Sequence, residues 1–219
     1  MNFDLAFALS LLPDMWQGLQ VTAVATIFGF AISLVVGGAL EAGRRSGVWL
    51  VQLCCDGYIA FIRCTPLLVQ LYFVFYVLPA YGIRGSAMTT GIVCLGMHIG
   101  SYIAEVYRAG IDSTPKGQWE AALSLGLSRR MTWLTVVLPQ TIPAILPTLG
   151  NYLIGLFKET PLLAAITVID LFGAANAVAG QTFKYNEPYT VAAVMLLVVS
   201  LVAAYGVKQL ERHYSRVGR

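Results

Sequence analysis

The stretch "GQWEAALSLGLSRR", residues 117–130, places a soluble-looking polar segment in the middle of an apolar chain. Its first half predicts a short helix. Thr114 or Ser113 can cap this helix, and Pro115 can occupy its first position, where the missing N–H of proline costs no hydrogen bond. We expect the helix to end at about Leu125.

The second half of the stretch ends this helix and begins another. Gly126 fits the left-handed position just after a helix C-terminus, which glycine adopts without steric penalty. Ser128 can cap a second helix, whose apolar side would carry Met131, Leu134 and Val137 or Leu138. The loop over residues 113–139 is therefore predicted to be two short helices at an angle.

Two interpretations of this loop are open from its residues. Ala121, Ala122 and Leu125 are predicted to share one face of the first helix, and Glu120 to remain exposed. A flat helix of this kind suits docking into a groove of another protein. An amphipathic connector on the lipid surface is the alternative. A connector, however, has no need of a glycine break followed by a Leu-Pro pair.

The composition of the whole chain places this loop in a membrane protein. The 219 residues are 58% hydrophobic and 11% charged, whereas soluble domains contain about 25% charged residues. A bilayer core needs about 20 residues of apolar helix. The charge-free stretches that can supply it lie between Asp14 and Glu41, Arg63 and Arg84, Arg84 and Glu105, Arg130 and Lys158, and Glu187 and Lys208. We therefore predict five membrane spans.

Two regions are less regular. Pro139, Pro143 and Pro147 recur at four-residue spacing near the start of the fourth span, so its ordered helix is expected to begin only after some of them. Residues 162–180 are semi-apolar but contain Asp170 and Asn176, which makes a sixth span unfavourable. We predict a short helix or a re-entrant segment there, and the sequence leaves a surface helix open across residues 162–187.

The charge distribution predicts the orientation. An odd number of spans puts the termini on opposite sides of the membrane. If the C-terminus is cytoplasmic, ten of the fourteen Lys and Arg residues lie inside: Arg44, Arg45, Arg108, Lys116, Arg129, Arg130, Lys208, Arg212, Arg216 and Arg219. Since Lys and Arg favour the cytoplasmic side, we predict an outside N-terminus and a cytoplasmic loop at residues 113–139.

The sequence lacks the residues that enzymatic chemistry would need. ATP hydrolysis would require a GxxxxGK[ST] phosphate loop, and no glycine in this chain is followed directly by lysine. The four cysteines lack CxxC spacing and the chain has two histidines, so neither a metal site nor a catalytic site is predicted. We expect no cofactor bound by this chain.

The loop carries a family resemblance. Glu120-Ala121-Ala122, followed by Gly126, Val136 and Leu138-Pro139, resembles the EAA motif of ABC-importer permeases, with valine where isoleucine is usual. Together with "YIAFIRCTPLLVQLYFVFY" and "VLPQTIPAILPTLGNYLIGLFKETPLLAAI", it makes most of residues 15–215 similar to the polar amino-acid permeases. The resemblance implies an all-α membrane protein of the type I ABC importer permease fold, a single transmembrane domain over residues 1–219.

The same resemblance implies partners and a role for each loop residue. In that family Glu120, Ala121, Ala122, Gly126 and Pro139 would couple the permease to ATPase subunits. A second permease, homologous or identical, two ATP-binding subunits that use ATP and Mg²⁺, and an extracytoplasmic solute-binding protein would complete the assembly in a bacterial inner membrane. No nucleic acid is expected.

The cargo is less defined. Residues 158–190 look most like the ectoine and hydroxyectoine branch, so the predicted cargo is a small zwitterionic or polar solute, either an amino acid or an ectoine-type compatible solute. Arginine, histidine or glutamine is an alternative. Two departures stand out: Cys64 replaces a usual glycine, and "KETP" at 158–161 replaces the commoner "KDTS".

Ionisable groups inside a bilayer are candidate functional groups, because burying them is costly. Lys158 and Glu159 follow the fourth span beside Thr160, where a broken helix could present ammonium, carboxylate and hydroxyl groups to a zwitterion. They could equally mark the outer boundary of the span. The neutral polar candidates for the pathway are Thr65, Gln70 and Asn151.

Other polar groups in the spans have structural interpretations. Glu105 and Arg108, three residues apart, are predicted to pair near the cytoplasmic face. Arg63 fits a cation at a helix end, and His98 fits an interhelical hydrogen bond. Two rival functions are weighed: a secondary transporter or channel driven by an ion gradient, and a membrane scaffold. The first predicts internal repeats, and we find none.

Overall fold

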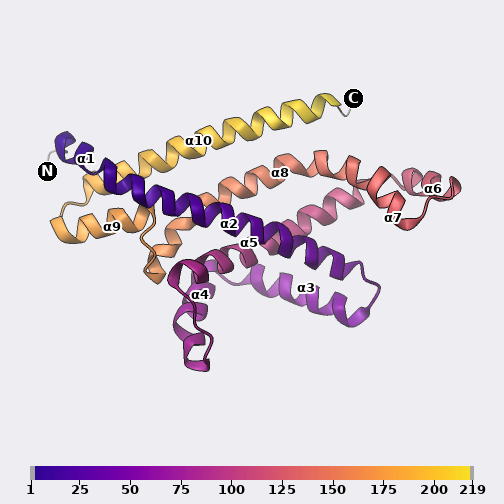
Figure 1. Ribbon diagram of the computed structural model, residues 1–219, viewed down its shortest axis with the longest axis horizontal. Helices are drawn as coiled ribbons and strands as arrows, with labels where there is room; N and C mark the ends of the chain where they lie inside the picture. The colour runs from indigo at the N-terminus through magenta and orange to yellow at the C-terminus, as the bar shows by residue number, and fades with distance from the viewer. Residues whose placement is uncertain (1–2, 218–219) are drawn as a thin grey trace.

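The computed structural model describes residues 3–217, with side chains described through residue 212, and every described element is helical (Figure 1). The α-helices are α1 (Leu5–Ser10), α2 (Leu12–Arg44), α3 (Trp49–Cys64), α4 (Leu67–Tyr72), α5 (Ala87–Asp112), α6 (Lys116–Ser124), α7 (Arg129–Thr132), α8 (Leu138–Glu159), α9 (Leu171–Thr182) and α10 (Asn186–Val217). Two π-helices, η1 (Phe73–Val77) and η3 (Trp133–Val137), and two 3₁₀ helices, η2 (Leu78–Tyr81) and η4 (Thr160–Ile166), connect them.

The described helices give four or five candidate spans where five were predicted, and the second predicted span is built differently from the others. Four described helices are long and apolar enough to cross a membrane, and a fifth span arises if Trp49–Cys64 and Leu67–Tyr81 count as one broken helix, bent by 105°. The prediction began this span at Arg63 and missed α3. The break is at Thr65, whose backbone is extended (φ −115°, ψ 136°). Thr65 precedes Pro66, and the proline ring disfavours the α conformation of the residue before it.

The three prolines of the fourth span do not delay its helix, which corrects the prediction. The helical run from Arg129 to Ile166 is continuous, with Pro143 and Pro147 inside α8. Directly before Pro139 the helix widens into η3. Membrane helices tolerate proline because such local adjustments and neighbouring helices satisfy the freed carbonyl groups. The second helix of the loop is thus the beginning of the span.

Helices α2 and α5 form the centre of the bundle, and glycines bring them close together. A Cβ atom at Gly96 would lie 2.5 Å from Ile32 Cγ2, and one at Gly100 would lie 2.7 Å from Val36 Cγ1. On α2, a Cβ atom at Gly37 would lie 2.7 Å from Ile103 Cγ2. These glycines permit the close packing of the two helices that small residues allow in membrane proteins.

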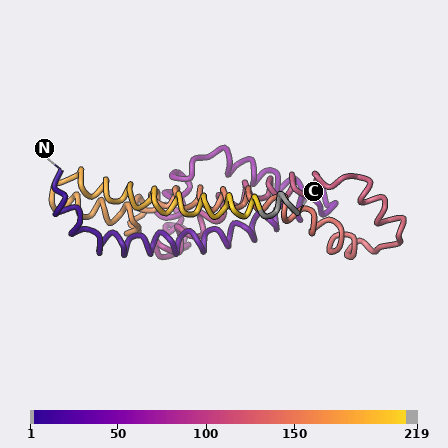
Figure 2. The backbone as a smooth tube through the Cα atoms, turned by 90° about the horizontal axis from the view of Figure 1, so that it is seen from above, coloured from indigo at the N-terminus to yellow at the C-terminus, as the bar shows by residue number. Residues whose placement is uncertain are grey.

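The two ends of the molecule differ. Helices α1 and α9 lie at one end, beside the beginnings of α2 and α10 (Figure 1). Of the short helix and the re-entrant segment predicted for residues 162–180, the structure has a short helix, α9, which extends to Thr182. At the opposite end, the α6–α7 segment projects beyond the long helices (Figure 2). Helix α10 runs from the α9 end toward the α6 end. An apolar core containing Leu95, Leu156 and Leu163 fills the middle.

Candidate functional site

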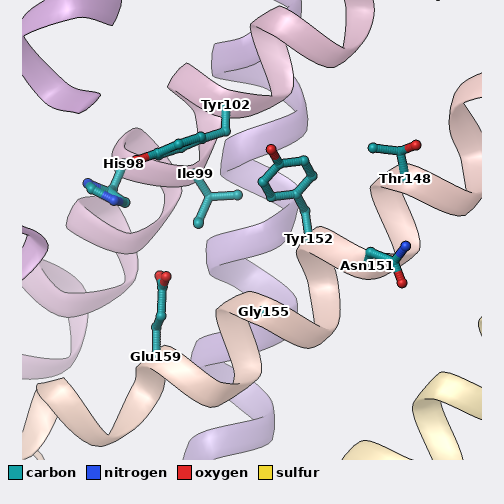
Figure 3. A pocket seen from close by; sticks show the side chains of 8 residues that line it. All are labelled: His98, Ile99, Tyr102, Thr148, Asn151, Tyr152, Gly155 and Glu159. Carbon is teal, nitrogen blue, oxygen red and sulfur yellow. The ribbon is translucent and has the colours of Figure 1, made fainter. Parts of the chain in front are cut away.

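An open cavity of about 520 Å³ lies between α5 and α8. Figure 3 shows its lining side chains, three from α5 and five positions from α8: His98, Ile99, Tyr102, Thr148, Asn151, Tyr152, Gly155 and Glu159. The cavity is mixed in character, since aromatic and aliphatic surfaces alternate with an amide, a hydroxyl, an imidazole and a carboxyl group. Such a lining is typical of sites for small polar ligands.

Glu159 is the charged residue of this cavity. Its Oε2 atom is buried and makes no hydrogen bond to any described residue. Its side chain extends from the last residue of α8 toward the α5 side of the cavity (Figure 3). A buried carboxylate oxygen without a partner is costly. It is therefore available to accept hydrogen bonds from a cationic or N–H-bearing ligand.

The structure separates the predicted pathway residues into two groups. Glu159 and Asn151 line the cavity together, whereas Lys158 is exposed and does not line it. Thr160 is fully buried, and its Oγ1 donates to the Phe157 carbonyl at 2.9 Å. Lys158 and Thr160 flank Glu159 in sequence but point elsewhere, because successive helical residues lie about 100° apart.

Thr65 and Gln70 line a second, largely apolar cavity of about 310 Å³ that also contains Cys94 and Met97. The two residues are hydrogen-bonded, with Gln70 Nε2 donating to Thr65 Oγ1 at 2.7 Å. Gln70 Oε1 lies 3.0 Å from His98 Nδ1. The predicted interhelical hydrogen bond of His98 is therefore present, and it connects the two cavities.

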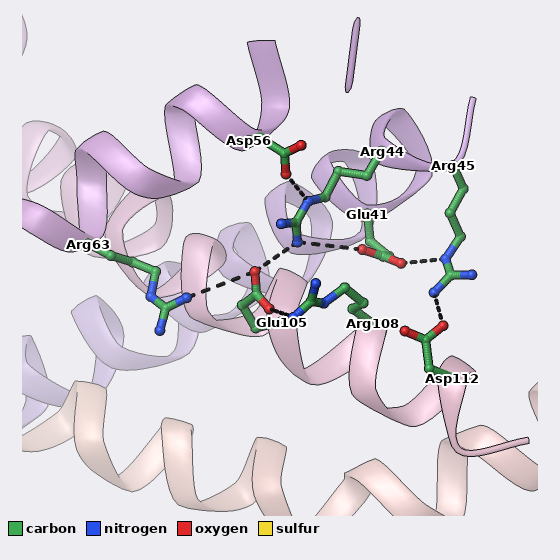
Figure 4. A network of polar contacts seen from close by, with 8 residues as sticks. All are labelled: Glu41, Arg44, Arg45, Asp56, Arg63, Glu105, Arg108 and Asp112. Atoms are coloured by element: carbon green, nitrogen blue, oxygen red, sulfur yellow. Dashed lines mark hydrogen bonds and ion pairs between the residues drawn. The ribbon is translucent and has the colours of Figure 1, made fainter. Parts of the chain in front are cut away.

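An ionic cluster ties α2, α3 and α5 together near the α6 end (Figure 4). Arg44 pairs with Asp56 at 2.5 Å and with Glu105 at 2.8 Å. The predicted pair of Glu105 and Arg108 is present at 2.9 Å. Arg63 lies 3.9 Å from Glu105, so the carboxylate of Glu105 is the centre of this cluster.

The cluster extends to the first residue after α2. Arg45 pairs with Glu41 and, at 2.6 Å, with Asp112. Burial lowers the pKa of the Arg45 guanidinium, but its hydrogen bonds to Asp112 and Glu41 outweigh that effect, so the pKa is raised. The guanidinium of Arg63 also lies 5.1 Å from the centre of the Tyr102 ring, which lines the Glu159 cavity. The cluster thus contacts the cavity wall.

The loop between α5 and α8 has the predicted break. Gly126 has φ +69°, and the N–H of Leu127 donates to the Ala122 carbonyl at 3.1 Å, which closes the end of α6. Ser128 Oγ accepts a hydrogen bond from the Met131 N–H at 3.3 Å, as its predicted capping role requires. Pro115 precedes the helix as its N-cap residue, so the prediction of Pro115 as the first helical residue was one position early.

The predicted alanine face of α6 is wrong in one respect. Ala122 is buried at 2% exposure, whereas Glu120 and Ala121 are exposed. Leu123 and Leu125 are each 77% exposed, so the loop presents Ala121 and Leu125 of the predicted face to its surroundings, together with Leu123, but not Ala122. Trp119 packs edge-on against Trp133, with ring centres 5.4 Å apart, and this contact holds α6 against η3.

The sequence matches a protein-family model over residues 29–216, and the family is described as the binding-protein-dependent transport system inner membrane component. The chain belongs to this family. A probable amino-acid ABC transporter permease, y4tG of Sinorhizobium fredii (strain NBRC 101917 / NGR234), is 41% identical to it over 93% of this chain and 88% of the relative. The glutamine transport system permease GlnP of Escherichia coli (strain K12) is 33% identical over 97% and 98%.

A solved structure has the same fold. A crystal structure of an amino acid ABC transporter with histidines superposes with a TM-score of 0.92 and 33% identity, covering 97% of this chain and 100% of that chain. The chain is thus an inner-membrane permease subunit of an ABC amino-acid importer with the type I fold. It is a transport component and not an enzyme, and ATP hydrolysis belongs to a separate subunit.

Sequence reasoning missed six of the eight lining residues of the cavity, among them three with aromatic rings. His98 was interpreted only as an interhelical contact, and Tyr102 and Tyr152 were not singled out. The spacing of His98 and Tyr102 by four residues, and of Tyr152 and Glu159 by seven, places each pair on one helix face. That periodicity could have been recognised in the sequence. The packing of α5 against α8 could not be predicted from the sequence, because it depends on the tertiary structure.

Proposed function

We propose that the permease passes an amino acid through the cavity between α5 and α8, with Glu159 as the group that receives its positive charge. The observation that carries this proposal is the buried Oε2 atom of Glu159, which has no hydrogen-bond partner among the described residues. An α-ammonium group would supply the missing N–H donors. Asn151 and Thr148 offer neutral groups for the polar remainder of the cargo.

Transport is proposed to proceed by alternating access. ATP and Mg²⁺ are used by two partner ATPase subunits, which dock on the α6–α7 segment around Glu120, Leu123 and Leu125. Their closure moves this segment with the long helix that continues from it, and a pair of permease chains opens toward the binding protein. The N-terminus then lies outside and the C-terminus in the cytoplasm, which agrees with the distribution of Lys and Arg.

The identity of the cargo rests on chemistry and on relatives. GlnP of Escherichia coli is named for glutamine, and a neutral or cationic amino acid fits a cavity with one carboxylate. Ectoine stays a prediction from the resemblance of residues 158–190, since its amidine also offers N–H groups to Glu159. Lys158, Thr65 and Thr160 have no place in the proposed binding site, while Gln70 contacts its lining residue His98.

The test is uptake by proteoliposomes that contain the whole complex and its binding protein. A panel of labelled glutamine, arginine, histidine, cystine and ectoine identifies the cargo. We expect Glu159→Gln to reduce uptake of the preferred amino acid at least tenfold, because a charge-assisted hydrogen bond is worth about 1.5–3 kcal/mol. The matched control is Glu211→Gln, an exposed carboxylate on α10. Normal uptake by Glu159→Gln would show that this cavity is not the cargo site.

A further inference from the structure

The orientation of the Gln70 side-chain amide is determined by its surroundings. Its Nε2 atom lies 2.9 Å from the Ile62 carbonyl oxygen, 3.1 Å from the Thr65 carbonyl oxygen and 2.7 Å from Thr65 Oγ1. Two of these atoms can only accept hydrogen bonds. A reversed amide would place its oxygen against both carbonyl oxygens. The Nε2 atom therefore faces the break between α3 and α4, and Oε1 faces α5.

This orientation determines which ring nitrogen of His98 carries the proton. Gln70 Oε1 can only accept a hydrogen bond, and it lies 3.0 Å from His98 Nδ1. Nδ1 must therefore be the donor. In a neutral imidazole the other nitrogen, Nε2, then has a free lone pair. The choice follows from the hydrogen-bond network, in which Gln70 has no alternative arrangement of equal quality.

His98 also lines the cavity that contains Glu159. It is 7% exposed and packs against the Tyr102 ring at 5.5 Å between ring centres. Figure 3 shows the imidazole on the α5 side, above the carboxylate of Glu159. Because Gln70 occupies Nδ1, Nε2 is the ring nitrogen left to accept a hydrogen bond from a ligand of this cavity, beside the Glu159 carboxylate. Two acceptors in one cavity suit a group with several N–H donors.

We propose that Gln70 is a positioning residue for cargo recognition: by accepting the Nδ1 proton of His98, it makes His98 Nε2 a second acceptor, beside Glu159, for a cationic N–H group of the amino acid. This inference rests on the proposed function and extends it to a residue that does not line the cargo cavity. The proposal also accounts for the position of Gln70, which makes four polar contacts beside a largely apolar cavity. Packing between two helices alone would not need such a hydrogen-bond network.

The protonation state of His98 is directly measurable, because the chain contains only two histidines. A His213→Gln permease labelled with ¹⁵N-histidine, assembled with unlabelled partner subunits, gives the ring signals of His98 alone. At a pH where the imidazole is neutral, we expect Nδ1 to be protonated and Nε2 not. We expect Gln70→Leu to populate the form protonated at Nε2. Protonation at Nε2 with Gln70 present, or no change in Gln70→Leu, would overturn the proposal.

Uptake kinetics supply the second test. With the amino acid that the uptake panel identifies, we expect Gln70→Leu to raise the half-saturating concentration about tenfold and to change the maximal rate much less. Val69→Ala is the matched control, since Val69 precedes Gln70 on α4 and lines the same apolar cavity. An unchanged half-saturating concentration in Gln70→Leu would overturn the role of Gln70 alone. Normal uptake by Glu159→Gln would instead overturn the proposed function.

Discussion

At the residue scale, the permease combines polar groups that serve the fold with polar groups that remain available. Thr160 and Ser128 satisfy backbone groups of their own segments. Glu159 lines a cavity and has a buried oxygen that finds no hydrogen-bond partner in the described part of the chain. Asp170 has a similar oxygen but serves the fold: its Oδ1 caps α9 by accepting from the Gly173 N–H at 2.8 Å, while its buried Oδ2 has no partner among the described residues.

Asp170 makes the stability of the permease depend on pH. Burial raises the pKa of its carboxyl from the usual 3.8 to about 6, so the folded protein holds this proton more tightly than the unfolded chain. The contribution of Asp170 to the free energy of unfolding is therefore largest below its unfolded pKa and is lost as the pH rises through about 6. Asp170→Asn keeps a capping oxygen and removes this titration.

The measurement is thermal unfolding of both proteins in detergent between about pH 4 and pH 7. We expect the Tm of the parent permease to fall relative to that of Asp170→Asn over this interval. Comparison of the two proteins cancels the other titrating groups. Parallel pH profiles would show that the carboxyl of Asp170 does not retain its proton in the folded state.

Gly126 is the residue on which the shape of the loop depends. Proline at this position could not adopt φ +69° and would remove the N–H that donates to the Leu123 carbonyl at 2.9 Å. We expect Gly126→Pro to reduce co-purification of the ATPase subunit at least tenfold, while the amount of permease in the membrane is unchanged. Gly117→Ala, with no atom within 4 Å of the new Cβ, is the control. Full ATPase recovery with Gly126→Pro would contradict the docking role.

The roles of residues that depend on the local backbone could be predicted from the sequence. The burial and cavity positions of residues that depend on packing between helices could not. Gly126 and Ser128 were predictable because a helix end restricts the backbone or demands a capping oxygen whatever surrounds it. Glu159 was predictable because a carboxylate at the end of a span is costly. The burial of Ala122 and the cavity position of His98 depend on the rotation of each helix against its neighbours, which periodicity on a single helix does not define.

At the element scale, the bundle depends on close contact between α2 and α5, and glycine spacing makes this contact possible. A valine at Gly96 would overlap Ile32, whose Cγ2 lies 2.5 Å from the position of a new Cβ. We expect Gly96→Val to destabilise the permease by about 1–3 kcal/mol through overpacking. Thermal unfolding in detergent measures the change, with Gly206→Val on α10, which has no neighbour within 4 Å, as the control. Equal Tm values for the two variants would argue against this contact.

The lengths of the helices could be predicted only in part from the sequence. The charge-free stretches predicted the spans, but α3 was missed because Asp56 and Arg63 interrupt its apolar surface. The structure explains these charges, since Asp56 pairs with Arg44 and Arg63 lies near Glu105. The continuity of α8 was also missed, because the prolines were expected to interrupt the helix as they do in soluble proteins. In a membrane span, a π-helical turn before Pro139 accommodates it.

At the scale of the whole molecule, the two proposed functional regions lie apart and one continuous helical run joins them. The run from Arg129 to Ile166 begins with α7, within the α6–α7 segment, and includes Glu159. The exposed Leu123 and Leu125 lie at the projecting end, where an ATPase surface would cover them (Figure 2). A movement of the α6–α7 segment can therefore reach the cavity along this continuous run. This arrangement is the basis of the proposed coupling.

The most direct test measures ATP hydrolysis and amino-acid uptake in the same proteoliposomes, comparing the intact complex with a complex that carries Leu125→Asp. The account predicts uptake that requires ATP and the binding protein, and its loss in Leu125→Asp although the permease is still inserted. Uptake that continues in Leu125→Asp, or that an ion gradient drives without ATP, would contradict the account.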